Sequence, residues 1–342
     1  MKKFLFKSAL FIVPFTILPL IIYLIIDPFK VLHSYSGEQE TSTEAYQMLT
    51  NRDYQSTELF VANYKKYNYD SYIFGNSRSF FYRVTTWNKL TGGNGYHFNA
   101  SGEGLFGVER KLDFINKLNR PVKNALIIID YELLSITTNR SGHLFIKDPV
   151  TSGESVLAFH YEMFKGFYPK GTVAFIDLYL THKKKKYMEK FGIRDNALKH
   201  DATTNQLTYS IYDNQIKTNP YAYYASKVHL FYKRDSVQRY SPPVISAEQI
   251  KLLVNIKQIF DANKTNCKII VSPLYDQIKL NQADINYLNN LFGKENVFDF
   301  SGINTITSDY HNYYEASHYR SDICDSLLTI VYTNNLKTVP KL

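Results

Sequence analysis

Cysteine is scarce in this sequence of 342 residues, which contains only Cys267 and Cys324, far apart along the chain. No two cysteines have the short spacing of a zinc site or a redox motif, and no other pattern predicts a metal or a cofactor. The two cysteines could form one disulfide if the domain is exported, or remain two buried thiols.

Signatures of nucleic-acid binding are also absent, although the net charge is +9 and residues 182–186 read HKKKK. The chain has neither zinc-finger spacing nor an RNA-binding motif. A short basic run is more typical of a solvated helix face or loop. We therefore expect no nucleic-acid partner.

An uncharged apolar run of 18 residues, 9–26, lies close to the N-terminus. Its length is within the range of a membrane-spanning helix. Lys2, Lys3 and Lys7 precede the run, so the positive-inside rule places the N-terminus in the cytoplasm. The run is longer than the apolar part of a cleaved signal peptide, and no small-residue cleavage site follows it. The sequence predicts a single-pass signal anchor over residues 1–30, with the rest of the chain outside the membrane.

The remaining chain is organised as an alternation of short apolar runs and amphipathic stretches. Residues 31–68 are polar and predict a stalk followed by a helical lead-in, and residues 69–340 form the main domain. Helices are predicted between the strands, including one over 77–90 directly after the first strand. Five strands are predicted, at residues 72–75, 96–99, 124–130, 267–273 and 296–300.

Strands that alternate with helices predict an α/β fold with a parallel sheet covered by helices on both faces. Ligand chemistry in such sheets collects at the carboxyl ends of the strands. Residues 135–245 interrupt the alternation, because they are polar, rich in tyrosine and difficult to assign. We interpret them as an insertion that caps or extends the active face.

Ser77 follows the first strand in the stretch SYIFGNSRSFFYR, residues 71–83. A serine at a strand-to-helix turn is exposed, and the N–H groups that begin the helix can stabilise an oxyanion. The nucleophile elbow of α/β-hydrolases has a second glycine, but Ser79 stands at that position. The pattern therefore favours a different serine chemistry, and the alternative is that Ser77 is simply a helix N-cap.

A partner for this serine is predicted near the end of the chain. His318 follows the fifth strand and precedes the last helix, so it also lies at the carboxyl edge. Glu315, three residues earlier, can hydrogen-bond the imidazole and fix its tautomer, as in a serine triad. Asp309 is a second-ranked candidate for the orienting acid.

The residues GNSR at 75–78 and E-x-x-H at 315–318, followed by Tyr319, resemble the first and last sequence blocks of the SGNH/GDSL hydrolase superfamily. They are most similar to its membrane-anchored bacterial branch, which is O-acetyltransferase- or esterase-like and acts on polysaccharides. The resemblance covers roughly residues 70–134 and 245–335 and leaves the insertion out. It implies a flavodoxin-like three-layer α/β/α sandwich with five parallel strands.

The resemblance also implies which residues carry the chemistry. It assigns Ser77 as nucleophile, His318 as general base and Glu315 as the orienting acid, where the family usually has aspartate. The asparagine of the family's G-x-N-D block is missing, because residues 127–131 read IIIDY. Arg78 can bind an anionic group, although pairing with Asp130 is the preferred interpretation. The predicted oxyanion or substrate contacts are Gly102, Ser101, Asp130, Arg78 and Asn76.

The implied function is that of an extracytoplasmic serine esterase or O-acyltransferase, attached to the bacterial inner membrane, with its domain periplasmic or extracellular. The expected substrate is a carbohydrate polymer or an acylated small molecule, and a transferase could use an acyl-donating membrane partner. The acyl group would pass from serine to water or to a sugar hydroxyl. The missing asparagine favours the alternative, a catalytically impaired protein that binds a glycan or assists envelope assembly.

Overall fold

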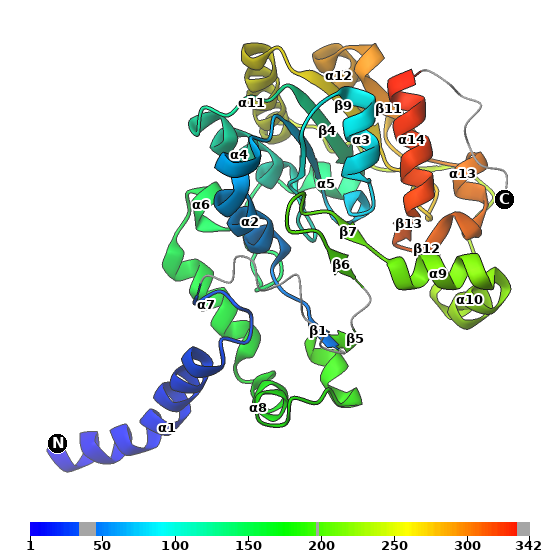
Figure 1. The fold of residues 1–342 in the computed structure, drawn as a ribbon. Helices are drawn as coiled ribbons and strands as arrows, with labels where there is room; N and C mark the ends of the chain where they lie inside the picture. Colours follow the sequence, from blue (N-terminus) through cyan, green and yellow to red (C-terminus); the bar gives the residue numbers. More distant parts are fainter. Residues whose placement is uncertain (34–45, 196–197, 334–342) are drawn as a thin grey trace.

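The protein is described by a computed structural model that covers residues 1–33, 46–195 and 198–333 (Figure 1). Within α1, several side chains, those of residues 9–14 among them, are not described. The predicted stalk falls mainly on residues 34–45, which lie outside the described residues.

A five-stranded sheet forms the centre of the molecule. Its strands pair in parallel throughout, in the spatial order β11-β9-β4-β2-β3. Numbered by their place along the chain, these strands run 2-1-3-4-5, which is the order of flavodoxin-like doubly wound folds. The predicted α/β fold with five parallel strands is confirmed. The strands are β2 (Ser71–Gly75), β3 (Gly95–His97), β4 (Asn124–Ile129), β9 (Asn266–Val271) and β11 (Val297–Asp299).

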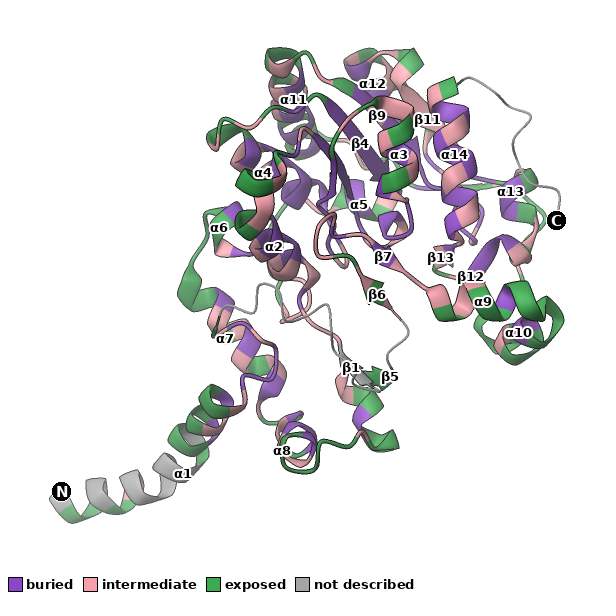
Figure 2. Ribbon diagram, in the orientation of Figure 1, coloured by how far each residue is buried: buried purple, intermediate pink, exposed green. Residues whose placement is uncertain are grey.

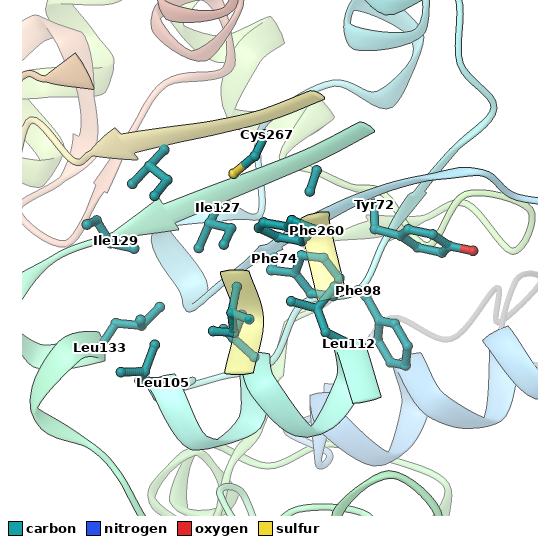
Figure 3. Packing of buried hydrophobic residues seen from close by; sticks show 14 of the residues in the cluster. Tyr72, Phe74, Phe98, Leu105, Leu112, Ile127, Ile129, Leu133, Phe260 and Cys267 are labelled. Atoms are coloured by element: carbon teal, nitrogen blue, oxygen red, sulfur yellow. The ribbon is translucent and has the colours of Figure 1, made fainter. Parts of the chain in front are cut away.

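Helices cover both faces of the sheet, and β2, β3 and β4 are completely buried, whereas β11 at one edge is partly exposed (Figure 2). One face packs against α2 (Arg52–Tyr67), α4 (Leu105–Lys117), α11 (Ala247–Asn263) and α12 (Gln282–Phe292). Figure 3 shows Phe74, Ile127 and Leu112 in this core, between the strands and α4. The other face packs against α3 (Val84–Thr91) and α14 (Ser321–Thr333).

The helices begin and end where their residues dictate. Ser246 and Gln249 form a capping box at the start of α11. Asn51 caps α2, whose Phe60 is fully buried among the aromatic side chains of β2 and β3. The helical lead-in is therefore an integral part of the core.

The helix predicted over residues 77–90 is wrong in its first half. The chain forms only a 3-10 turn, η2 (Ser77–Ser79), and the α-helix begins at Val84. The intervening Phe80, Phe81 and Tyr82 are all buried. A helix at the surface of a sheet can bury one stripe of side chains but not three consecutive ones. An irregular turn places all three rings in the core.

The insertion folds in two parts. The first part consists of α5 (Tyr131–Ser135), α6 (Pro149–Ser152), α7 (Val156–Phe167), α8 (Thr172–Thr181), η3 (Lys186–Phe191) and β5 (Ile193–Asp195), which pairs with β1 (Tyr46–Met48). Of these elements, α7 and α8 pack beside α1. The second part comprises β6 (Lys199–His200), β7 (Leu207–Thr208), α9 (Ser210–Thr218), α10 (Pro220–Lys227), η4 (Val228–Leu230) and β8 (Arg239–Tyr240), which pairs with β10 (Ile278–Lys279). This second part contributes Tyr223 and Tyr224 to the core that also contains α14.

A long helix, α1 (Lys2–Ile26), projects from the body at the N-terminus (Figure 1). Its C-terminal end is held by Tyr23, whose ring lies against Phe164 and Phe167 of α7. In the part of the chain that the structure describes, no helix is apolar over a sufficient length to cross a membrane. The membrane span predicted over residues 9–26 is thus not supported by the described residues.

The chain ends with short elements that carry the predicted histidine. They are η5 (Lys294–Asn296), α13 (Thr305–Ser308), η6 (Tyr310–Asn312), β12 (Tyr313–Glu315) and β13 (His318–Tyr319), and they precede α14. Cys267 in β9 and Cys324 in α14 are both free, buried thiols, so the disulfide alternative does not hold.

Candidate functional site

Gly75 ends β2 and begins the turn that follows this strand. Its φ of +155° is rarely adopted by residues with a side chain. A Cβ atom at this position would lie 2.8 Å from Ser79 Cβ and 2.9 Å from the carbonyl oxygen of Ile128. Both the dihedral angle and the space therefore require glycine here, directly before the candidate nucleophile.

The turn after β2, residues 75–79, is held by Asn76. The Asn76 side-chain oxygen accepts a hydrogen bond from the Arg78 N–H at 3.0 Å. The Asn76 carbonyl accepts from the Ser79 N–H at 2.9 Å and from the Ser79 hydroxyl at 2.7 Å. Asn76 is thus the N-cap of η2. The N-cap alternative for Ser77 is wrong, because Ser77 is the first residue inside the turn.

Ser77 lies at the point where the strand order of the sheet reverses, between β2 and the adjacent strands β3 and β4. Ligands of open α/β sheets bind in the crevice at such a point, outside the carboxyl ends of the strands. Ser77 is partly exposed, and within the described residues its hydroxyl has no hydrogen-bond partner. A hydroxyl in this position can meet a substrate.

His318 and Glu315 face one another in the β12–β13 hairpin, residues 313–319. The two strands pair antiparallel with Glu315 opposite His318, and His318 Nδ1 is hydrogen-bonded to Glu315 Oε1. The other carboxylate oxygen accepts from the Ser317 N–H at 2.6 Å. Burial raises the pKa of Glu315, but the contacts with His318 and Ser317 outweigh it and lower the pKa below its ordinary value. Glu315 is therefore an ionised acceptor for the imidazole.

Asp309 does not take this role. Its carboxylate lies 2.7 Å from Nδ1 of a different histidine, His311, and both side chains are largely exposed. The ranking of Glu315 above Asp309 as the partner of His318 is confirmed. The pairing leaves Nε2 of His318 available, and the side chain is 18% exposed.

The β12–β13 hairpin and the turn after β2 lie next to each other. Cα atoms of η2 and β13 approach within 8 Å. The ring of Phe81, which follows the turn, meets the imidazole of His318 edge to face at a centroid distance of 5.8 Å. The structure thus brings together the two segments that the sequence analysis paired across more than 200 residues.

Asp130 occupies the carboxyl end of β4, directly beside the turn. One of its oxygens accepts from Asn76 Nδ2 at 2.8 Å, and the other accepts from the Leu133 N–H at 2.8 Å. Because Asp130 is an acceptor in both contacts, it supports the turn and does not donate to an oxyanion. Asp130 lies within residues 127–131, the stretch that lacks the G-x-N-D asparagine of the family that the sequence resembles.

Arg78 pairs with the same carboxylate. Its guanidinium lies 3.7 Å from Asp130 and 2.8 Å from Glu132. Burial lowers the pKa of Arg78, but the two acids outweigh it, so the net shift is upward. The predicted pairing of Arg78 with Asp130 is confirmed, and the charge of Arg78 is already matched by two carboxylates.

The loop between β3 and α4 carries the other candidate oxyanion residues. It runs beside β2, because the Ala100 N–H reaches the carbonyl of Gly75 at 3.4 Å. Ser101 and Gly102 follow, both partly exposed. Gly102 has φ +54°, and its carbonyl accepts from Arg140 of the insertion at 3.3 Å. The loop is therefore next to the turn, and among the described residues no contact between Gly102 and Ser77 is formed.

His97 is a neighbour of the turn that the sequence analysis did not single out. It ends β3, is fully buried, and places Nε2 3.3 Å from the Ser79 hydroxyl. Burial, with the nearby charges of Arg52 and Lys111, lowers the pKa of His97 to about 3. His97 is thus neutral, and its ring contacts the Ser79 hydroxyl. Its position inside the strand predicted at residues 96–99 was the available signal.

The insertion supplies a second unexpected neighbour, Tyr209. Its ring lies 4.7 Å from that of Phe81 and 4.8 Å from that of Tyr212. Burial and the negative charge of Glu315 raise the pKa of Tyr209. The insertion therefore reaches the segment that carries His318, as its interpretation as a cap of the active face requires.

Comparison with known proteins identifies no relative. No family model matches the chain, and neither the curated proteins nor the solved structures contain a match.

Proposed function

We propose that the protein is a serine esterase or O-acyltransferase of the SGNH type, acting on acyl esters, most simply acetyl esters, of a cell-surface or exported polysaccharide. The observation that carries the proposal is the His318–Glu315 pair, held beside the turn of Ser77 at the switch point of the sheet. The choice of polysaccharide rests on the resemblance of the GNSR and E-x-x-H blocks.

In this mechanism Ser77 Oγ attacks the ester carbonyl while Nε2 of His318 takes the hydroxyl proton. Glu315 holds the imidazole by its other nitrogen and stabilises the imidazolium. The N–H groups at the start of η2 and in the β3–α4 loop stabilise the tetrahedral oxyanion. His318 then gives its proton to the departing alkoxide, which leaves acyl-Ser77. Water or a sugar hydroxyl, deprotonated in turn by His318, releases the acyl group.

Labelling with a fluorophosphonate tests the proposal. We expect the full chain to be labelled once, labelling to disappear in Ser77→Ala, and labelling to fall steeply in His318→Ala. Ser135→Ala is the matched control, because Ser135 is exposed and bonds only within its own short helix. Labelling that persists in Ser77→Ala would contradict the assignment of the nucleophile.

The alternative is a glycan-binding protein without catalysis. It is favoured by residues 127–131, which lack the oxyanion-donor asparagine of the family that the sequence resembles and in which Asp130 is an acceptor. It is also favoured by the partly exposed rings of Tyr209 and Tyr212, which lie near His318 and the buried Phe81, because aromatic rings suit sugar stacking. Absence of labelling together with retention on an acetylated polysaccharide column would support this second function.

The proposed location is the outer face of a bacterial cytoplasmic membrane, with α1 as the attachment. The support is the exposed apolar side chains of α1, such as Leu20, Leu24 and Ile25, behind the exposed Lys3 and Lys7. Alkaline carbonate extraction of membranes from cells that express the full chain tests the location. Retention in the pellet is expected, and complete release would contradict the proposed attachment.

A further inference from the structure

The second part of the insertion is fastened directly to the β12–β13 hairpin. In Figure 1, α9 and α10 lie beside β12 and β13. The Tyr223 hydroxyl donates to the carbonyl of Tyr314 at 3.0 Å. The Tyr224 hydroxyl lies 2.6 Å from the carbonyl of His311 and 3.1 Å from that of Tyr313. Two neighbouring tyrosines of α10 thus hold the backbone of the segment that presents Glu315 and His318.

A side-chain contact from α9 completes this attachment. Tyr314 immediately precedes Glu315, and alternation along a strand directs the two side chains to opposite faces. The Tyr314 hydroxyl is hydrogen-bonded to the carboxylate of Asp213 and lies 3.1 Å from the Ser321 hydroxyl. Burial and the hydrogen bond to Asp213 raise the pKa of Tyr314, so the phenol stays protonated as a donor.

The same network reaches the chain that follows the nucleophile. Arg83 donates to the Ser321 hydroxyl at 2.8 Å and forms an ion pair with Asp325 of α14. Arg83 lies six residues after Ser77 and is the N-cap residue of α3. A continuous path therefore runs from the insertion through Tyr314 and Ser321 to the segment that carries Ser77.

We propose that Asp213 is a positioning residue of the site: it fixes Tyr314, and through Tyr314 the orientation of the hairpin that carries His318 beside the turn of Ser77. The assignment of a role in catalysis rests on the proposed serine chemistry, whereas the effect on the hairpin does not. Asp213 touches neither Ser77 nor His318 through any contact among the described residues. The insertion therefore contributes a positioning residue to the active site.

Two readouts on the full chain test the proposal, with Asp213→Asn and Tyr314→Phe as the variants. In amide hydrogen exchange, residues 313–319 should exchange about tenfold faster than in the wild type, the expected effect of losing a hydrogen bond to a charged group. The amides of β4 should be unchanged. In fluorophosphonate labelling, the maximal rate constant should fall about tenfold while the concentration for half-maximal rate and the final stoichiometry stay constant.

Asn214→Ala is the matched control, because Asn214 is the exposed neighbour of Asp213 in α9. Asp213→Glu keeps the carboxylate and should recover most of the wild-type rate. Unchanged exchange in residues 313–319 of both variants would overturn the proposal. Faster exchange with an unchanged labelling rate would overturn the positioning role alone. A wild type that is never labelled would refute the serine chemistry, and the exchange result would still decide whether Asp213 holds the hairpin.

Discussion

The turn after β2 is held in place by its own residues, whereas the β12–β13 hairpin is held by side chains from the insertion. Asn76 makes the hydrogen bonds that shape the turn, and Gly75 fits against the neighbouring strand. The hairpin instead depends on Tyr223, Tyr224 and Asp213, which lie about 100 residues earlier in the chain. The segment of the candidate nucleophile is therefore held by local residues, and the segment of the candidate base is held by residues distant in the chain.

This difference predicts that the two segments respond differently to substitution. Changes in the turn should act on folding and on the site together, because the turn is packed against the central sheet. Changes at the partly exposed Glu315 and His318 should act mainly on the chemistry, whereas Tyr313, Tyr314 and Tyr319 of the same hairpin are buried in the core.

The largest expected effect is on the hairpin histidine. His318→Ala removes the base, and the fluorophosphonate labelling rate should fall by a factor on the order of 10³. Unfolding in urea should be little changed. His311→Ala is the matched control, because His311 forms a similar pair with Asp309 a few residues away. Equal losses in the two variants would contradict the assignment of His318.

Gly75→Ala tests the local fixation of the turn. The substitution forces a Cβ against Ser79 and Ile128 in an unfavourable dihedral region, so the free energy of unfolding should fall by about 3 kcal/mol. Gly92→Ala is the control, because Gly92 has φ +66° but open space around its Cβ position. It should cost about 1 kcal/mol. Similar losses in urea unfolding would show that crowding at Gly75 is unimportant.

The smallest expected effect, counted per pH unit, is the loss of stability on acidification that His97 causes. The folded protein holds the pKa of His97 at about 3, whereas the ordinary value is 6.5. As pH falls below 6.5, the unfolded chain binds a proton that the folded protein does not bind. The contribution of His97 to stability should therefore decrease by about 1.4 kcal/mol per pH unit until the pH approaches 3.

Urea unfolding at several pH values checks this expectation. Between pH 6.5 and 4.5, His97→Gln should remove much of the slope of the free energy of unfolding against pH. His229→Gln, at an exposed histidine, should leave this slope unchanged. An unchanged slope in His97→Gln would show that other groups cause the acid sensitivity.

The sequence analysis predicted the sheet well and the supports of the site poorly. Continuous apolar runs such as residues 124–129 mark buried parallel strands, and each predicted strand matches an observed one within a few residues. The GNSR turn and the Glu315–His318 pair are contiguous motifs, so their spacing was visible in the chain. Their relative position followed from the rule that strand ends share one edge.

The remaining features depend on contacts that leave little trace in a single sequence. Phe80, Phe81 and Tyr82 depart from the helical pattern because the fold buries all three side chains. The role of His97 arises from its contact with Ser79, which follows the adjacent strand β2. Asp213 lies in a polar, tyrosine-rich stretch, where no periodicity distinguishes it from the residues around it.

The most direct test of the central claim is a crystal structure of the full chain after reaction with a fluorophosphonate. The account predicts phosphorus bound to Ser77 Oγ, with Nε2 of His318 at about 3 Å from that oxygen or from the phosphoryl group, and Nδ1 still paired with Glu315. An adduct on another residue, or an imidazole of His318 turned away from Ser77, would contradict it.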